Sequence, residues 1–156
     1  MKVDYIHYLR SMVGKEKVIM TVCGAFVLEE KDRLLLQLRS DTNTWGLPGG
    51  FMEMDEKVEE AARRETKEET GIELGNMSLF GIYSGPRLHK TFPNGDQVAL
   101  VQILFTCRDF SGNLLYKDEE TLDAQFFPLN DLPKNIFEKH QWFIDDLIHK
   151  QPPVIG

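Results

Sequence analysis

The chain has 156 residues, of which 42% are hydrophobic and 28% are charged, values typical of one folded domain over residues 1–156. This composition excludes a disordered, collagen-like or disulfide-dense protein. The formal net charge is −7, from 18 Lys and Arg against 25 Asp and Glu, so we expect no nucleic-acid or membrane partner. Small phosphate ligands remain compatible with this charge, through a local basic patch or a bound cation.

The N-terminal residues contain no uninterrupted apolar stretch, and no window approaches the roughly 18 apolar residues that a membrane span requires. The two cysteines, Cys23 and Cys107, each lie within an apolar run. Such sparse usage favours reduced core thiols over a disulfide. Together these features predict a soluble cytoplasmic protein.

The first part of the chain is predicted to form a helix and a hairpin. Apolar residues at helical spacing over residues 4–13 indicate a short amphipathic helix that ends at Gly14, so residues 1–14 form an N-terminal helical segment. Residues 18–28 are too rich in β-branched side chains for a helix and predict a buried strand. A polar turn then leads into a second strand over residues 34–38, its hairpin partner.

The rest of the chain is expected to supply two further helices and three further strands. The predicted helices cover residues 57–70 and 136–148, and the predicted strands cover residues 79–84, 98–105 and 125–129. The first of these helices ends at Gly71, the residue type most common just after a helix C-terminus. This mixture indicates an α/β fold, a sheet covered by helices.

Three glutamates of the central predicted helix fall on its inward face. At about 100° per residue, Glu65, Glu68 and Glu69 lie on the same side as the apolar stripe of the helix's first half. Carboxylates placed in this way repel one another and lose hydration. A hard divalent cation, Mg²⁺ or Mn²⁺, removes both costs. Arg64 can orient or neutralise Glu68.

The competing interpretation is an ordinary salt-bridged helix, with Arg64 paired to Glu60 and Glu68. The agreement between the carboxylate face and the flanking glycines favours the metal site. The opposite face of the helix is expected to be solvated and consists of Glu59, Glu60, Arg63 and Lys67.

The stretch from Gly50 to Ile72 resembles the Nudix box, a loop–helix–loop written G-x5-E-x7-R-E-U-x-E-E-x-G-U, where U is a bulky aliphatic residue. The matching fixed positions are Gly50, Glu56, Arg64, Glu65, Glu68, Glu69, Gly71 and Ile72. Thr66 replaces the usual aliphatic residue, at the margin of the buried stripe, where we expect a small packing cost. Residues 34–39, 45–50 and 126–133 also look like the family's flanking segments, so the resemblance covers most of the chain.

The resemblance implies an α/β/α sandwich with a mixed β-sheet, and hydrolysis of a nucleoside diphosphate linked to another moiety. It implies that Glu65, Glu68 and Glu69 are metal ligands for Mg²⁺ or Mn²⁺, with support from Glu56 and from the backbone of Gly50. A cation at this position would neutralise phosphate oxygens and acidify a water. Homodimers are common in the family.

The general base varies in position among family members, so several candidates stand. Glu120 is the first, because a glutamate in the corresponding loop serves this role in some members. Glu119 and Glu53 are the alternatives, and Arg64 is counted with the catalytic residues because it can orient a carboxylate. The competing interpretation of residues 117–120 is a solvated acidic turn.

Candidate substrate contacts lie outside the box. Arg39 resembles the arginine that other members place near phosphates, and Arg87, His89 and Lys90 form a basic cluster in one loop. For all of these cations the alternative is simple solvation. The candidates for stacking on a base are Phe51 and Phe92. Trp45 is expected in the core, and no role is assigned to His7, His140 or His149.

The sequence favours ADP-ribose as substrate only through Pro86, which lies near the position where many ADP-ribose hydrolases of the family carry a proline. Two alternatives remain: a (d)NTP pyrophosphohydrolase, and a non-catalytic module that senses a nucleotide. Because all four box glutamates are intact, the enzyme is favoured over the sensor.

Overall fold

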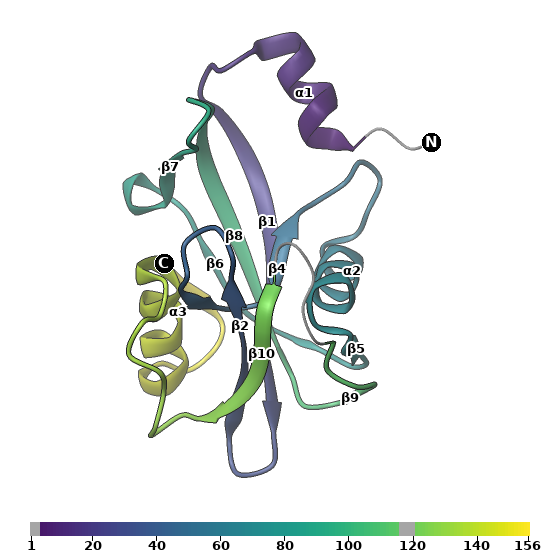
Figure 1. Ribbon diagram of the computed structural model, residues 1–156, viewed down its shortest axis with the longest axis vertical. Coiled ribbons are helices and arrows are strands. Elements are labelled where there is room, and N and C mark those ends of the chain that lie inside the picture. Colours follow the sequence, from purple (N-terminus) through teal and green to yellow (C-terminus); the bar gives the residue numbers. More distant parts are fainter. Residues whose placement is uncertain (1–3, 116–120) are drawn as a thin grey trace.

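The computed structural model describes residues 4–115 and 121–156 of the chain. Its helices are α1 (Tyr5–Val13), α2 (Val58–Thr70) and α3 (Glu138–His149), with a 3-10 turn η1 (Pro86–Leu88). Its strands are β1 (Val18–Glu29), β2 (Arg33–Arg39), β3 (Trp45–Gly46), β4 (Gly49–Phe51), β5 (Glu73–Leu74), β6 (Ser78–Tyr83), β7 (His89–Thr91), β8 (Gln97–Cys107), β9 (Phe110–Ser111), β10 (Thr121–Pro128) and β11 (Val154–Ile155). Helices α2 and α3 flank the main sheet, and α1 lies at one end of the molecule (Figure 1).

The main sheet has the strand order β10-β2-β1-β8-β6-β11 and mixes parallel with antiparallel pairs. The long central strands β1 and β8 run parallel, from Val18 opposite Val98 to Val27 opposite Cys107. The predicted hairpin is present, since β2 pairs antiparallel with β1. On the outer sides, β10 pairs antiparallel with β2 and β6 pairs antiparallel with β8. This is the mixed α/β sandwich that the sequence predicts.

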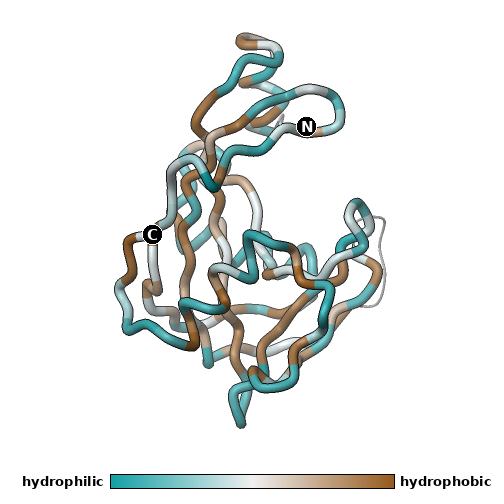
Figure 2. The backbone as a smooth tube through the Cα atoms, turned by 90° about the vertical axis from the view of Figure 1, so that its left-hand side faces the viewer, coloured by the Kyte–Doolittle hydropathy of each residue, from teal (hydrophilic) through white to brown (hydrophobic). Residues whose placement is uncertain are grey.

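Strand β1 is buried on both faces because each face supports one helix. Cys23, Ala25 and Val27 face the core shared with α2, and Phe26 and Leu28 face the core shared with α3. This alternation follows from the two-residue period of a strand. Hydrophobic segments accordingly run through the interior of the molecule, while most of the outer bends of the chain are hydrophilic (Figure 2).

Helix α2 differs from expectation at two positions. Thr66 is fully buried instead of marginal, and its hydroxyl has no hydrogen-bond partner within the described residues. Arg63 is not merely solvated, because its guanidinium donates to the carbonyls of Leu74 and Gly75 at 3.2 and 2.9 Å. The strand that follows α2 folds back beside the helix, which a helical wheel cannot show. Gly71 ends the helix with φ of 81°, as the sequence predicts.

The remaining differences concern short strands and boundaries. Strand β10 begins at Thr121, four residues before the prediction, because its first residues pair with the end of β2. The short strands have only two or three residues each, and segments of that length have no local signature. Both cysteines are buried free thiols, as expected. In the described part of the chain, no helix combines the length and apolar character needed to cross a membrane.

Candidate active site

The loop between β3 and α2 lies against the sheet because it is rich in glycine. Strand β4 pairs with β1 through Gly49 opposite Gly24 and Gly50 opposite Cys23. A Cβ atom at Gly50 would come within 2.7 Å of Oε1 of Glu65, so only glycine allows the loop to approach this carboxylate so closely. The first glycine of the box therefore brings its own backbone beside a predicted metal ligand.

The carboxylate of Glu69 is desolvated by burial. Its carboxylate accepts hydrogen bonds from the backbone N–H of Gly49 at 2.8 Å and from Nε2 of Gln37 at 2.7 Å. Burial nevertheless raises the pKa of Glu69 to about 8, with a further contribution from the charge of Glu65. The two hydrogen bonds and the charge of Arg39 offset only part of the desolvation, and no ion pair to Glu69 is formed within the described residues.

Arg64 organises the other box glutamates. Its guanidinium donates to both oxygens of Glu56, at 2.6 and 3.1 Å, and to the carbonyl of Phe51 at 3.0 Å. It also contacts Glu65 at 2.9 Å and, more weakly, Glu68 at 3.4 Å. These bonds to Glu56 and Glu65 raise the pKa of Arg64, which stays charged. Arg64 thus ties the loop before α2 to the carboxylate face of the helix.

The four carboxylates Glu53, Glu65, Glu68 and Glu69 line one open cleft, and Arg39 also lines it. Within residues 4–115 and 121–156, no three acidic, histidine or cysteine side chains have converged into a closed metal centre. The donor set still fits a hard divalent cation, since it consists of carboxylate oxygens and includes the desolvated Glu69. Cation binding here would offset the burial of that charge.

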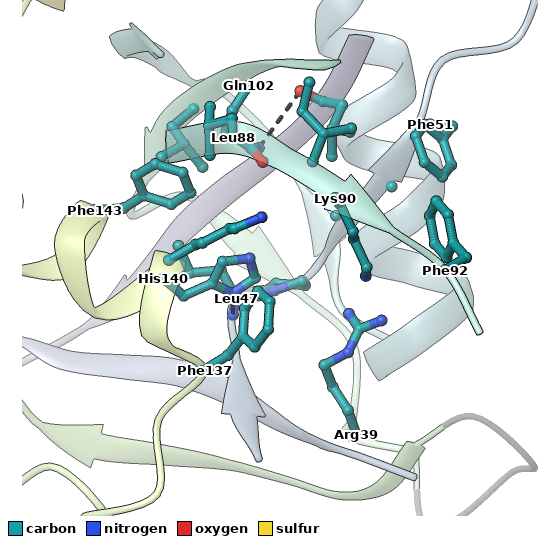
Figure 3. A pocket seen from close by; sticks show the side chains of 17 residues that line it. Arg39, Leu47, Phe51, Leu88, Lys90, Phe92, Gln102, Phe137, His140 and Phe143 are labelled. Carbon is teal, nitrogen blue, oxygen red and sulfur yellow. Dashed lines mark hydrogen bonds between the residues drawn. The ribbon is translucent and has the colours of Figure 1, made fainter. Parts of the chain in front are cut away.

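A second, more apolar pocket adjoins the cleft, and the two share Arg39, Gly49, Gly50 and Phe51. Its walls include the predicted stacking residues Phe51 and Phe92 and, from the segment before α3, Phe137. Arg39, at the end of β2, and Lys90, in β7, point into the same space (Figure 3). This pocket is therefore aromatic at its sides and cationic at the boundary with the cleft.

Lys90 lies between aromatic rings. Its Nζ is 4.6 Å from the ring centroid of Phe92 and 5.8 Å from that of Phe137. Burial lowers the pKa of Lys90, and the charge of Arg39 lowers it further. Two cations held this close in a partly buried place favour an anionic ligand between them.

His140 is a pocket residue that the sequence analysis left without a role. Its Nδ1 accepts a hydrogen bond from the backbone N–H of Leu47 at 2.9 Å, across 93 residues of sequence. Burial lowers the pKa of His140 to about 3, and the charge of Arg39 adds to this effect, so the ring is neutral. No local pattern could have identified it, because its role depends on how α3 packs beside the loop before β4.

The predicted basic cluster separates in the structure, which corrects its assignment as one unit. Lys90 lines the pocket, but Arg87 is exposed and stacks on Trp142 at 3.9 Å. The imidazole of His89 lies 3.1 Å from the hydroxyl of Thr91 and lines neither the pocket nor the cleft. The 3-10 turn η1 and the extended β7 direct these neighbouring side chains differently. Trp45 is in the core, as expected.

Of the three candidates for the general base, Glu53 lies in the cleft. Glu119 and Glu120 lie outside the described residues.

A family model, the NUDIX domain, matches residues 19–147 of the chain. The chain belongs to the NUDIX family. The family membership and the fold class expected from the sequence are thereby confirmed, and with them an enzyme of the Nudix hydrolase class, acting on pyrophosphate bonds.

Individual relatives agree with this membership. The chain is 40% identical over 121 residues to a protein of Methanocaldococcus jannaschii named "ADP-ribose pyrophosphatase", covering 75% of this chain and 67% of that protein. It is 38% identical to a "MutT-like protein" of Streptomyces ambofaciens, over 70% of this chain and 64% of that one. The solved MutT NUDIX hydrolase of Burkholderia pseudomallei superposes with a TM-score of 0.69 at 28% identity, covering 81% of this chain and 96% of that one. The chain thus spans about two thirds of the length of these two curated relatives.

Proposed function

We propose that this NUDIX protein hydrolyses the pyrophosphate bond of a nucleoside diphosphate linked to another moiety, either ADP-ribose or a nucleotide sugar. The observation that carries the proposal is that the carboxylate cleft adjoins the aromatic pocket through the shared residues Arg39, Gly49, Gly50 and Phe51. A substrate with its phosphates in the cleft and its base in the pocket would use both. The relative named "ADP-ribose pyrophosphatase" supports this substrate class.

In this proposal Glu65, Glu68 and Glu69 hold Mg²⁺, or Mn²⁺ in its place, with Gly50 leaving room beside them. The bound cation supplies charge neutralisation at the pyrophosphate and an acidified water. Glu56 and Arg64 hold the carboxylates in orientation. The general base stays a prediction among Glu53, Glu119 and Glu120, and so does a homodimer.

Arg39 and Lys90 contact the phosphates at the boundary between the cleft and the pocket, where their side chains point toward the same space. Phe51 and Phe92 offer ring faces to a base. Asp41 pairs with Arg39 at 3.3 Å and holds its guanidinium at the edge of the cleft.

A second candidate is a (d)NTP pyrophosphohydrolase, which the relatives named MutT favour. The two candidate reactions differ in the second product that hydrolysis releases besides the nucleoside monophosphate. The first releases a sugar phosphate, and the second releases inorganic pyrophosphate. A sensor without catalysis is disfavoured by the intact carboxylate set in the cleft.

The test is a phosphate-coupled turnover screen over ADP-ribose, nucleotide sugars and (d)NTPs with Mg²⁺, with Mn²⁺ and with chelator. We expect metal-dependent cleavage of ADP-ribose or a nucleotide sugar. In the same assay Glu68→Gln should lower turnover by about a hundredfold, as losing a transition-state contact does. Its matched control is Glu59→Gln, an exposed glutamate of the same helix, which should leave turnover unchanged.

Cleavage of (d)NTPs alone would transfer the proposal to the second candidate. Nucleotide binding without turnover, measured by thermal shift, would favour the sensor. Retained turnover in Glu68→Gln would remove this residue from the metal site.

A further inference from the structure

Helix α1 makes polar contacts with the rest of the molecule at both of its ends. None of its residues is buried, and it stands apart from the sandwich (Figure 1). At its C-terminal end the Arg10 side chain donates to the carbonyl of Gln97 at 2.8 Å and lies 3.5 Å from the carboxylate of Asp96. Ile6 also lines a shallow apolar pocket with Met20 and Phe51, and the polar contacts at the two ends of the helix add to this packing.

At its other end α1 contacts the cleft directly. The backbone N–H of Tyr5 donates to Oε2 of Glu53 at 2.8 Å. Tyr5 is the first residue of the helix, so this N–H has no acceptor within the helix and is free to point outward. The Asp4 side chain caps a different donor, the N–H of His7. Asp4 and Ile6 also line the cleft that holds the box glutamates.

Glu53 is in turn hydrogen-bonded to Glu56, one of the box glutamates. Its own N–H donates to Oε1 of Glu56 at 2.9 Å, and Glu56 receives two hydrogen bonds from Arg64. Arg64 in turn contacts Glu65 and Glu68. An unbroken series of hydrogen bonds therefore runs from the first turn of α1 to two of the predicted metal ligands.

We infer that the first turn of α1 belongs to the active site. The backbone N–H of Tyr5 is a positioning group for the carboxylate of Glu53. By holding the carboxylate of Glu53, it fixes the loop from Gly50 to Glu56 in the shape that Glu56 and Arg64 require. The contact acts on the geometry of the cleft and not on substrate affinity. This inference rests on the proposed function, because it assigns a part to the same cleft.

The N–H of Tyr5 can be removed without breaking the helix. Proline is favoured at the first helical position, where its missing donor costs no helical hydrogen bond. It also requires an extended residue before it, and Asp4 already has φ of −71° and ψ of 158°. Tyr5→Pro therefore deletes the contact to Glu53, and Tyr5→Ala, which lacks the same ring but keeps the N–H, is its matched reference.

We expect kcat of Tyr5→Pro to fall about tenfold or more below that of Tyr5→Ala, the size typical of lost ligand-orienting contacts, with KM within about twofold. In a Glu53→Ala background the change from alanine to proline at position 5 should have no further effect, because the acceptor is gone. Equal kcat for the two variants, or a tenfold loss that persists in the Glu53→Ala background, would overturn the inference.

A second readout does not depend on activity. Hydrogen exchange of the peptide from Phe51 to Glu56, measured in the full-length variants, should be faster in Tyr5→Pro than in Tyr5→Ala, since the loop loses an anchor. Unchanged exchange in this peptide would count against the contact. If the wild-type protein cleaves no substrate, the proposed function fails, and the exchange comparison alone decides whether α1 orders this loop.

Discussion

At the scale of single residues, the pocket is distinguished by a lysine placed between two phenylalanine rings. Lys90 makes no ion pair within the described residues, although it lies partly buried near Arg39. A cation held in this way without a carboxylate partner keeps its hydrogen-bonding capacity for a ligand. The guanidinium of the neighbouring Arg87, by contrast, makes a cation–π contact with the ring of Trp142.

Lys90→Met should therefore weaken substrate binding. It keeps the packing against Phe92 but removes the charge, and a lost hydrogen bond to a charged group is worth about 1.5–3 kcal/mol. We expect KM to rise about tenfold with a smaller change in kcat, measured by steady-state kinetics on the best substrate. Arg87→Met, from the same loop, should leave KM within about twofold. Equal effects of the two changes would place Lys90 outside the binding site.

His140 should make the protein sensitive to mild acid. Its pKa is about 3 in the folded protein, against 6.5 for an ordinary histidine. Above pH 6.5 the ring is neutral in both states, but between pH 6.5 and 3 only the unfolded chain binds the proton. Folded stability therefore falls as the pH decreases through this range, by at most about 1.4 kcal/mol per pH unit.

The comparison is with His140→Asn, which keeps an acceptor for the N–H of Leu47 but does not titrate. Urea unfolding at pH 7 and at pH 4.5 should show the wild type losing more stability than the variant. A pH-independent difference between the two proteins would mean that His140 has the same pKa in the folded and the unfolded chain.

At the scale of elements, α2 carries both the predicted metal ligands and a buried hydroxyl group that makes no hydrogen bond within the described residues. The hydroxyl of Thr66 is buried without a partner within the described residues, in the box position that usually holds an aliphatic side chain. The hydroxyl of Thr70, one turn later, donates to the carbonyl of Thr66 at 2.7 Å and accepts from the N–H of Ile72. Two threonines on one helix face therefore have opposite hydrogen-bonding states.

Replacing each threonine by the isosteric valine should have opposite consequences. Thr66→Val removes an unsatisfied polar group and should stabilise the protein by about 1 kcal/mol, while Thr70→Val removes two hydrogen bonds and should destabilise it by about 1–2 kcal/mol. Thermal or urea unfolding measures both. If Thr66→Val is also destabilising, a water or a residue outside the described ranges satisfies its hydroxyl.

Gln37 of β2 links α2 and β10 through hydrogen bonds next to Glu69, a predicted metal ligand. Its side chain, buried in β2, donates to Glu69 of α2 at 2.7 Å and accepts from the hydroxyl of Thr121 in β10 at 2.9 Å. Because the amide uses one donor and one acceptor, both partners fix its orientation. The carboxylate of Glu69 is thus held by the sheet as well as by the Gly49 backbone.

At the scale of the whole molecule, the acidic cleft predicts that metal binding and folding are linked. A cation that binds only the folded protein stabilises it by about 2.7 kcal/mol when present at a hundred times its dissociation constant. We expect Mg²⁺ or Mn²⁺ to raise the melting temperature by several degrees and chelator to reverse the shift. Glu68→Gln should reduce the shift, and Glu59→Gln should preserve it. Equal shifts in both variants would indicate metal bound elsewhere.

Much of this architecture is readable from the chain, because it depends on local periodicity. The helix of the box, the face on which its glutamates lie and its end at Gly71 all follow from residues within three or four positions of one another. The long strands and the hairpin of β1 with β2 follow from runs of β-branched and apolar side chains. The structure adds only short strands and adjusts boundaries by a few residues.

What the sequence determined by itself is thus the family, the fold class and the carboxylate face of α2. The tertiary structure decided which partners those carboxylates have and which side chains face the pocket. Lys90 and Arg87 are near neighbours in the sequence but point to different surroundings. His140 reaches Leu47 across 93 residues, and Tyr5 reaches Glu53 across 48. Contacts between residues so far apart follow from packing of the whole fold, which no local period encodes.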